Sequence, residues 1–219
     1  VEALTGLRRP ASGTVRLDGR DVTGFGPDRL FDLGLAHVPE DRQREGLVGS
    51  FSVADNLVLN QLGNPPFSRR GRLDRDAITR HAGGLVADFD VRTSSVDEPA
   101  ATLSGGNQQK VIVAREFFHS RRLLVLSQPT RGLDVGSIQY IHARVVEKRD
   151  EGAAVLLVSS ELDEVMALAD RIAVMYRGRI IGVLHRANAT RDNVGCLMAG
   201  VEIEPDEIAA TAGEEVIVT

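Results

Sequence analysis

The 219-residue sequence predicts an α/β fold built on a mostly parallel sheet with helices on both faces. Three observations predict it. Two apolar runs, Leu123–Leu126 and Ala153–Val158, have the composition of strands buried on both faces of a parallel sheet. Between these runs, isoleucine and valine recur at helical spacing at positions 138, 141, 145 and 146, which indicates a strand–helix–strand unit. A third buried strand, Leu35–Val38, precedes them.

The composition is that of an ordinary globular protein. Hydrophobic residues make up 42% and charged residues 26% of the chain, and its net charge of −5 gives no electrostatic reason to expect nucleic acid as a partner. No apolar run approaches the ~18 residues of a membrane-spanning helix, so we expect any membrane association to go through a partner protein. The single Cys196 excludes an internal disulfide framework and fits a reducing cytosol. We interpret it as a small core residue of a C-terminal helix.

The first forty residues predict a helix, a hairpin, a second helix and a strand. Val1–Leu7 has helical spacing. Gly13–Leu17 alternates like a half-buried strand and is followed by the hairpin turn Asp18-Gly19. Pro27–Leu33 predicts a short helix with proline at its start. The strand after it ends in Pro39–Arg42, where parallel sheets place ligands, although a solvated loop is the commoner outcome.

Residues 41–102 predict a helical subdomain inserted into this fold. Ser52–Leu59 and Arg75–Phe89 are expected to be helices, and residues 63–72 between them read as a loop because they are rich in proline and glycine. This loop carries an arginine cluster for which a solvated surface is the commoner role and contact with a partner the alternative: Arg69, Arg70 and Arg72.

The C-terminal part predicts a small antiparallel β element. Leu162–Leu168 is expected to be a helix, and the runs Arg171–Tyr176 and Arg179–Leu184 are expected to pair as a hairpin. We expect residues 1–200 to form one domain with the insertion inside it, and residues 201–219 to form a loosely ordered acidic tail.

The stretch Leu103–Lys110, with the sequence Leu-Ser-Gly-Gly-Asn-Gln-Gln-Lys, predicts a glycine turn that runs directly into a helix. Ser104 can cap the first turn, and the glycines permit close backbone approach and positive φ. Such a helix start directs free N–H groups and a positive dipole end at an anion, most naturally a phosphate. The glycines alone fit an ordinary capped helix equally well. The whole string resembles the signature motif of ABC-type ATPases, and its ending resembles the branch that imports sugars and nucleosides.

The resemblance extends over nearly the whole chain. Leu123–Asp134 is similar to the Walker B and D-loop region of that family, Val155–Glu161 to its switch region, and Val38–Arg42 to its Q-loop. The resemblance implies a P-loop NTPase-like ABC ATPase domain that binds ATP and Mg²⁺. Asp134 matches the D-loop aspartate and can also cap the helix that follows.

Several positions depart from the family pattern. Ser127 and Gln128 stand where the family has the aspartate that helps to hold Mg²⁺ and the glutamate that polarises the attacking water. Ser160 stands at the switch histidine and Glu40 at the Q-loop glutamine. No G-x-x-x-x-G-K-[ST] loop is present, and by family comparison it should end just upstream of Val1, so we expect this chain to be a fragment that lacks the Walker A part.

These departures predict that the chain does not hydrolyse ATP in its own right. Loss of a general base alone costs about 10²- to 10⁴-fold in rate. Phosphoryl transfer depends on positioning and charge neutralisation, so little activity should survive the loss of several such groups. We expect no metal site either, because the five histidines show no metal-binding spacing.

The intact signature implies a role in a partner's ATP site. By resemblance, Ser104, Gly105 and Gly106 contact the γ-phosphate of ATP that the partner holds together with Mg²⁺, and Gln108 helps to fix the nucleotide. The implied partners are a second, upstream nucleotide-binding domain on the same polypeptide, membrane permease subunits and, indirectly, an extracytoplasmic solute-binding protein. The implied location is peripheral, on the cytoplasmic face of the membrane. Pro65–Leu73 and Gln128-Pro129-Thr130 lean toward nucleoside rather than sugar importers.

Two other functions stay open. One is a non-transport ABC protein that acts on ribosomes or DNA, although the chain has neither basic linkers nor long coiled-coil arms. The other is a nucleotide-sensing dimerisation module that binds ATP without hydrolysis.

Overall fold

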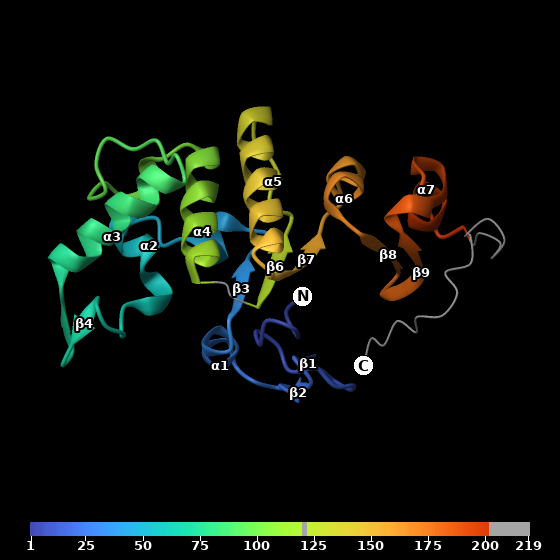
Figure 1. Cartoon of the computed structure of the whole chain (residues 1–219), viewed down its shortest axis with the longest axis horizontal. Coiled ribbons are helices and arrows are strands. Elements are labelled where there is room, and N and C mark those ends of the chain that lie inside the picture. Colours follow the sequence, from blue (N-terminus) through green and yellow to red (C-terminus); the bar gives the residue numbers. More distant parts are fainter. Residues whose placement is uncertain (120–121, 202–219) are drawn as a thin grey trace. The chain divides into compact units, whose positions relative to one another are not determined.

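The computed structural model describes residues 1–119 and 122–201, which form two compact units divided between Val158 and Ser159 (Figure 1). Apart from Val201, the acidic tail expected at 201–219 lies outside the described residues.

The first unit is built on a parallel three-stranded sheet in the order β3-β6-β7. The strands are β3 (Leu35–Val38), β6 (Leu123–Ser127) and β7 (Ala154–Val158). Leu35 lies opposite Leu123, and Leu123 lies opposite Ala154. The central strand is β6, which is why its apolar run is the most deeply buried of the three. The predicted α/β fold with a parallel sheet is confirmed.

Helices cover both faces of this sheet. On one face, α4 (Gly105–His119) and α5 (Val135–Asp150) share a core with the strand residues Ala36, Leu124 and Leu126. On the other face, Leu35 and Val125 pack with Leu30 of α1 (Pro27–Asp32). Alternation along β3 and β6 therefore sends successive side chains into two different cores.

The prediction that the run at 153–158 is buried on both faces is wrong. Leu156 and Val158 of β7 are each 37% exposed, whereas Val155 and Leu157 pack against the core. These side chains are exposed because of the place of β7 in the sheet. Within residues 1–158, β7 is the end strand, and alternate side chains along it face outward.

The insertion is helical, as predicted, and its two α-helices begin at side-chain caps. Ser52 Oγ accepts a hydrogen bond from Asp55 N at 3.0 Å and starts α2, and Asp74 Oδ1 accepts one from Ala77 N at 2.9 Å and starts α3. The elements are η1 (Arg42–Gly46), α2 (Val53–Leu57), η2 (Leu59–Gln61), β4 (Ser68–Arg69), β5 (Arg72–Leu73), α3 (Arg75–Asp88) and η3 (Ala100–Thr102). The predicted loop at 63–72 therefore contains most of a β-hairpin, β4–β5, that composition did not reveal.

The helix predicted at Val1–Leu7 is wrong. The segment forms a single turn, in which Thr5 N donates to Val1 O at 3.1 Å, and Gly6 then adopts a φ of 76°. A Cβ at Gly6 would lie 2.5 Å from Phe25 O, so the chain bends closely over the start of α1. The hairpin predicted next is confirmed as β1 (Arg16–Leu17) and β2 (Arg20–Asp21), joined by Asp18-Gly19.

The second unit contains the predicted helix and hairpin with its own small core. The elements are α6 (Leu162–Leu168), β8 (Arg171–Tyr176), β9 (Arg179–His185), η4 (Arg186–Asn188) and α7 (Arg191–Met198). Ile172, Leu184 and Leu197 lie in this core. Cys196 of α7 is exposed, so its assignment to the core is wrong. Among the described residues of both units, no helix is long and apolar enough to cross a membrane.

Candidate functional site

The start of α4 has the geometry expected of a capped helix. Ser104 is exposed, its Oγ accepts hydrogen bonds from Asn107 N at 3.4 Å and Asn107 Nδ2 at 3.0 Å, and its carbonyl accepts the first helical bond from Gln108 N. The predicted cap is confirmed. A helix of 15 residues presents free N–H groups and about half a positive charge at this end.

The two glycines at the start of this helix leave room for side chains that lie close to them. Neither has a positive φ, so that part of the sequence prediction is wrong. Instead, a Cβ on Gly105 would lie 2.9 Å from Arg42 Nη2, and a Cβ on Gly106 would lie 2.7 Å from Ser137 Oγ and 3.4 Å from Asp134 Oδ2. The glycines therefore let the segments at the Q-loop and D-loop positions lie directly against the signature.

An arginine-centred network holds the Q-loop position. Glu40 Oε1 lies 2.6 Å from Arg131 Nη1, and Arg42 Nη1 donates to Arg131 O at 3.1 Å. Among the residues that the structure describes, the buried Arg42 Nε has no hydrogen-bond partner. The Arg42 guanidinium thus stands beside the first signature glycine with unused hydrogen-bonding capacity, which suits a phosphate.

Asp134 serves as the predicted N-cap of α5. Its Oδ1 accepts from Ser137 N at 2.9 Å and its Oδ2 from Ser137 Oγ at 2.8 Å. The backbone hydrogen bond from Ser137 lowers the pKa of Asp134, so its carboxylate stays ionised beside Gly106.

The Walker B position carries no negative charge. Ser127 is 7% exposed, and its Oγ lies 3.5 Å from Nε2 of His37 on the neighbouring strand. Burial lowers the pKa of His37 to about 4, so this imidazole is neutral at pH 7. Gln128 follows with a φ of 48°, and its N donates to Val158 O at 2.8 Å. The Walker B position of this chain thus has a serine beside a neutral imidazole, followed by an amide, and lacks the carboxylate oxygens through which proteins usually bind Mg²⁺.

Two further predicted residues are Ser160 and Gln108. Ser160 is exposed and belongs to the second unit. Gln108 is 6% exposed, and its Nε2 donates to Ala100 O at 3.3 Å. Its side chain faces the protein interior, so it supports the loop that precedes the signature and is not placed to fix a nucleotide.

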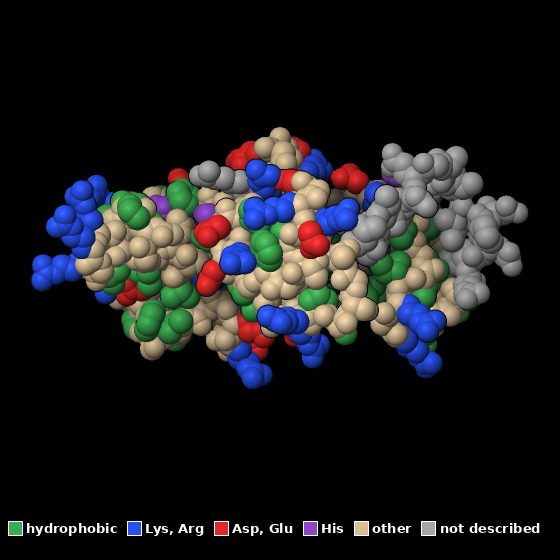
Figure 2. Space-filling model, turned by 90° about the horizontal axis from the view of Figure 1, so that it is seen from below, with side chains coloured by type: hydrophobic (Ala, Val, Ile, Leu, Met, Phe, Trp, Pro, Cys, Tyr) green, Lys and Arg blue, Asp and Glu red, His purple; other side chains and the backbone are tan. Residues whose placement is uncertain are grey.

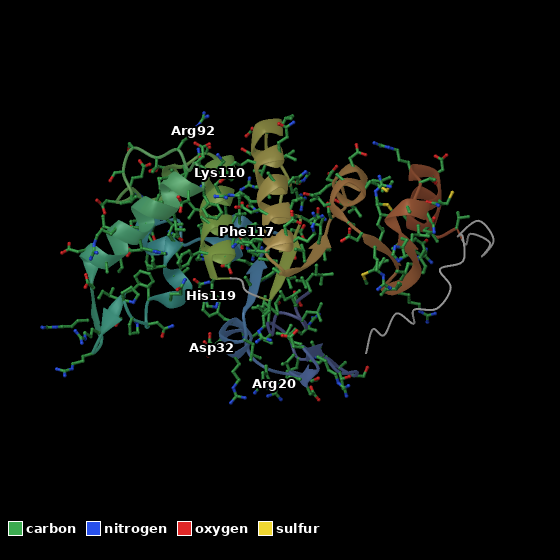
Figure 3. All side chains as sticks on the ribbon, in the orientation of Figure 1. Arg20, Asp32, Arg92, Lys110, Phe117 and His119 are labelled. Atoms are coloured by element: carbon green, nitrogen blue, oxygen red, sulfur yellow. The ribbon has the colours of Figure 1, made fainter. Side chains whose placement is uncertain are left out.

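Further contacts fix α4 in place. Lys110 Nζ lies 2.7 Å from Asp90 Oδ2 and 4.6 Å from the centroid of the Tyr140 ring. Asn107 Oδ1 accepts from Arg92 N at 2.8 Å. Figure 3 shows Arg92 and Lys110 near the start of the helix, on the side that carries the signature.

Four residues of this arrangement have no role that the sequence predicted: Arg42, Arg131, Ser137 and His37. Arg42 could have been found, because it follows Glu40 and Asp41 at the end of a buried strand. Ser137 stands three residues after a capping aspartate, where its backbone N–H is expected to bond. The contacts of His37 and Arg131 join strands and loops about 90 residues apart, and no local pattern signals them.

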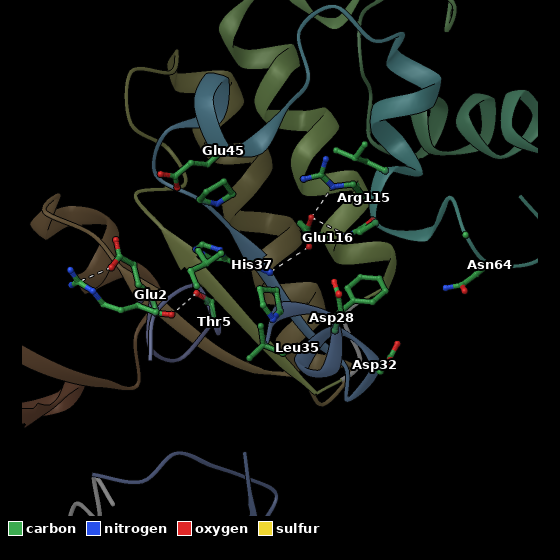
Figure 4. A pocket seen from close by; sticks show the side chains of 18 residues that line it. Glu2, Thr5, Asp28, Asp32, Leu35, His37, Glu45, Asn64, Arg115 and Glu116 are labelled. Carbon is green, nitrogen blue, oxygen red and sulfur yellow. Dashed lines mark hydrogen bonds and ion pairs between the residues drawn. The ribbon is translucent and has the colours of Figure 1, made fainter. Parts of the chain in front are cut away.

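The same unit has a cleft of about 930 Å³ (Figure 4). Thr5, Asp28, His37, Glu45, Arg115 and Glu116 are among its lining residues, and none of the predicted site residues lines it. Arg115 Nε lies 2.8 Å from Glu116 Oε1, and both side chains are buried. Because His37 lines the cleft and also contacts Ser127, the cleft lies directly behind the Walker B position.

Comparison with known proteins gives the family. The sequence profile described as ABC transporter matches residues 1–131, more than half of the chain. The chain belongs to the ABC transporter family.

Relatives of this ABC transporter domain carry import functions in their names. It is 47% identical over 203 residues to the nucleoside import ATP-binding protein NupA of Lactococcus lactis subsp. cremoris. It is 44% identical over 200 residues to the guanosine import ATP-binding protein NupO of Bacillus subtilis. These matches cover 93% and 91% of this chain but only 40% and 39% of the relatives, so the domain spans about two-fifths of their length.

Solved ATP-binding cassettes have the same fold. A nucleotide-free cassette from an ABC transporter aligns with a TM-score of 0.71 at 21% identity, and the match covers 97% of this chain and 82% of that one. A dimeric cassette bound to ADP and Pi aligns with a TM-score of 0.68 at 19% identity, covering 84% of this chain and 78% of that one. This ABC transporter domain therefore has the ABC ATPase cassette fold.

Proposed function

We propose that this chain is an ATP-binding domain of an importer for nucleosides or simple sugars, and that its signature completes the ATP site of a partner domain. One contrast carries the proposal. The start of α4 is exposed at Ser104 and flanked by the Arg42 guanidinium, whereas Ser127 is buried against a neutral imidazole. The chain thus offers a phosphate-binding surface but no carboxylate at the Walker B position.

At the helix start, each group has a distinct task. The backbone N–H groups and the Ser104 hydroxyl would hydrogen-bond the terminal phosphate of ATP, and Gly105 and Gly106 keep side chains out of the way. Arg42 would add a formal positive charge. Asp134 holds Ser137 against Gly106 and so fixes the D-loop relative to the signature. Bound ATP supplies the phosphoryl group for the reaction.

The chain's own site lacks the groups for hydrolysis. Gln128 cannot accept a proton from water, Ser127 cannot anchor Mg²⁺, and Ser160 cannot act as an imidazole does. We therefore propose that the partner domain holds most of the contacts to ATP and Mg²⁺, and that Glu40 at the Q-loop position takes part in coupling through its pair with Arg131.

We also propose the assembly in which the domain works. Residues 1–200 would form one nucleotide-binding domain without its Walker A part, with 41–102 as the insertion and 201–219 as an acidic tail. The partner would bind head to tail and would be a second nucleotide-binding domain upstream on the same polypeptide. The remaining partners would be permease subunits and, indirectly, an extracytoplasmic solute-binding protein. The domain would then work on the cytoplasmic face of the membrane.

Nucleosides are the substrate class we favour. The relatives named for nucleoside and guanosine import are 47% and 44% identical to this chain, against 40% for a glucose import protein of Haloferax volcanii and 38% for a ribose import protein of Rubrobacter xylanophilus. Uptake of labelled nucleosides and of labelled ribose, measured in cells with and without the complete transporter, tests this choice. We expect nucleoside uptake alone to depend on the transporter; uptake of ribose alone would assign it to sugars, and uptake of neither would contradict the importer proposal.

The neutral Ser127–His37 contact also suits a second candidate, a nucleotide-sensing module without hydrolysis. Signature disruption in the intact protein separates the two. An importer loses ATP hydrolysis in the partner site, whereas a sensing module has no hydrolysis to lose. A non-transport role on ribosomes or DNA has no support from the relatives named above, which are import proteins.

A further inference from the structure

We infer that the β4–β5 hairpin is a docking surface for anionic phospholipid headgroups. The inference rests on the proposed function only in that it requires a membrane near the domain. The residues concerned are Arg69, Arg70 and Arg72 at the tip of the insertion. The proposed phosphate binding at the start of α4 gives these residues no role.

The hairpin places like charges directly opposite each other. Arg69 of β4 is the cross-strand partner of Arg72 of β5, and Arg70 occupies the two-residue turn between them with a φ of 52°. Directly opposed side chains in such a pair have Cβ atoms about 5 Å apart, and like charges at that spacing destabilise a hairpin. The left-handed conformation of Arg70 is also unfavourable for a residue of this size.

A second hairpin in the same chain, β1–β2, also carries arginines, but its arginines lie near groups that attract them. The β1–β2 hairpin has the same two-residue turn, with φ of 51° at Asp18 and 74° at Gly19, against 52° at Arg70 and 75° at Gly71. There, Arg16 lies opposite Asp21, and the Arg20 guanidinium lies 5.7 Å from the centroid of the Phe25 ring. In this hairpin, one arginine thus lies opposite a carboxylate and the other lies near an aromatic ring.

The arginines of the β4–β5 hairpin have no such neighbours among the described residues. Within residues 1–119 and 122–201, none of the side chains of Arg69, Arg70 and Arg72 forms an ion pair or hydrogen bond. All three are exposed in a chain of net charge −5. Figure 2 shows Lys and Arg side chains gathered at the side of the first unit where Figure 1 places β4. An external anion would relieve the repulsion that the cross-strand pair creates.

The hairpin is anchored firmly enough to present this charge. Phe67 at its base is 3% exposed and its ring lies 4.9 Å from the His81 ring. Asp74 N donates to Phe67 O at 2.9 Å, which continues the pairing of the two strands into the cap of α3. The three guanidinium groups therefore project together from a fixed base.

The shape of the tip favours a membrane over a folded acidic protein. A two-residue turn is convex, with Arg69 and Arg72 on one face and the 43% exposed Leu73 on the other. A layer of headgroups can surround a convex tip, pair each guanidinium with phosphate and accept the apolar side chain at the interface. A protein partner would need a concave acidic surface of matching shape.

Vesicle binding by the intact protein, purified without permease subunits and without nucleotide, tests the inference. Two kinds of vesicle are compared, phosphatidylcholine alone and phosphatidylcholine with about one-third phosphatidylglycerol. We expect binding to the anionic vesicles only, weakened by added salt. Each arginine near an anionic surface contributes roughly fivefold in affinity, so Arg69→Gln/Arg72→Gln should bind about 25-fold more weakly.

The matched control is Arg16→Gln/Arg20→Gln, which removes the same charge from the other hairpin and should bind as the wild type does. Arg69→Lys/Arg72→Lys should retain most of the binding, and an unfolding transition no lower than that of the wild type shows that the fold of each variant is intact. Equal losses in both glutamine variants, binding to phosphatidylcholine alone, or binding to polyglutamate but not to vesicles would each overturn the inference. Because the assay needs neither ATP nor a partner domain, its failure leaves the proposed function standing, and failure of the proposed function leaves this result interpretable.

Discussion

Single residues at the start of α4 are determined by what lies against them. The sequence suggested glycines for their freedom in φ, but both adopt helical conformations and are needed for the space that a side chain would fill. Spacing and residue type predicted the cap at Ser104 and the cap at Asp134, because capping acts within three residues. The Arg42–Gly105 contact joins segments about 60 residues apart, which no local pattern reports.

Gly106→Ala should lower the free energy of unfolding by about 1–3 kcal/mol. The new Cβ would lie 2.7 Å from Ser137 Oγ, which could move only by breaking its 2.8 Å hydrogen bond to Asp134. Urea unfolding of the intact protein measures this. Gly84→Ala is the control, since no atom outside its own helix lies within 4 Å of a Cβ there, and it should be stabilising by about 0.5–1 kcal/mol. Adding Ser137→Ala should recover part of the Gly106→Ala loss; a fully additive double variant would contradict the contact.

His37 should make stability depend on pH. Burial lowers its pKa from 6.5 to about 4, so between these values the unfolded chain takes up a proton that the folded chain does not. Stability contributed by the neutral imidazole is therefore complete above pH 6.5 and is lost as the pH falls to 4, by about 3 kcal/mol at most. Unfolding free energies of wild type and His37→Gln should diverge across this window. If the unfolding free energies of the two proteins changed with pH in parallel, the lowered pKa of His37 would be contradicted.

Among the elements, the sequence predicted those whose pattern is local and missed those decided by neighbours. The strand Leu35–Val38 and the helix Leu162–Leu168 have the predicted bounds, because apolar runs and helical spacing are read within a few residues. The burial of β7 was misjudged, since composition does not reveal whether a strand is at the end of its sheet. The β4–β5 hairpin was missed because its strands have only two residues each and because the proline and glycine around them are typical of a loop.

The buried pair Arg115–Glu116 joins α4 to its surroundings. Glu116 accepts from Asn60 Nδ2 at 3.3 Å and from His37 N at 3.4 Å, and Arg115 Nη1 donates to Asn56 O at 3.3 Å. These contacts tie the signature helix to strand β3 and to the insertion. The sequence predicted none of them, because the pattern of α4 indicates which residues are apolar but not which buried charges meet.

Glu116→Ala should therefore destabilise the protein by about 3–5 kcal/mol, because it leaves the Arg115 guanidinium buried without its counter-charge. The double variant Arg115→Met/Glu116→Leu should lose much less, since no charge then remains in the core. Thermal or urea unfolding of the intact variants compares the two. If the double variant were as unstable as the single one, packing rather than charge would be the cause.

At the scale of the whole molecule, the order of the motifs predicted the fold and the family, and both are confirmed. The roles of the site residues, which individual substitutions in those motifs suggest, stay predictions. The parallel sheet, the insertion and the cassette fold are all present as expected. The central claim goes further: this cassette acts through its signature, on ATP held by a partner, and not through its own Walker B position. The neutral contact between Ser127 and His37 and the open start of α4 support that division of roles.

ATP hydrolysis by the purified, assembled transporter tests this claim most directly. Ser104→Arg places a long side chain where the phosphate would bind and should reduce the rate to background, while Gln128→Ala, in the position of the missing catalytic glutamate, should change it by less than about twofold. A large loss from Gln128→Ala, or a transporter that hydrolyses ATP normally with Ser104→Arg, would contradict the account.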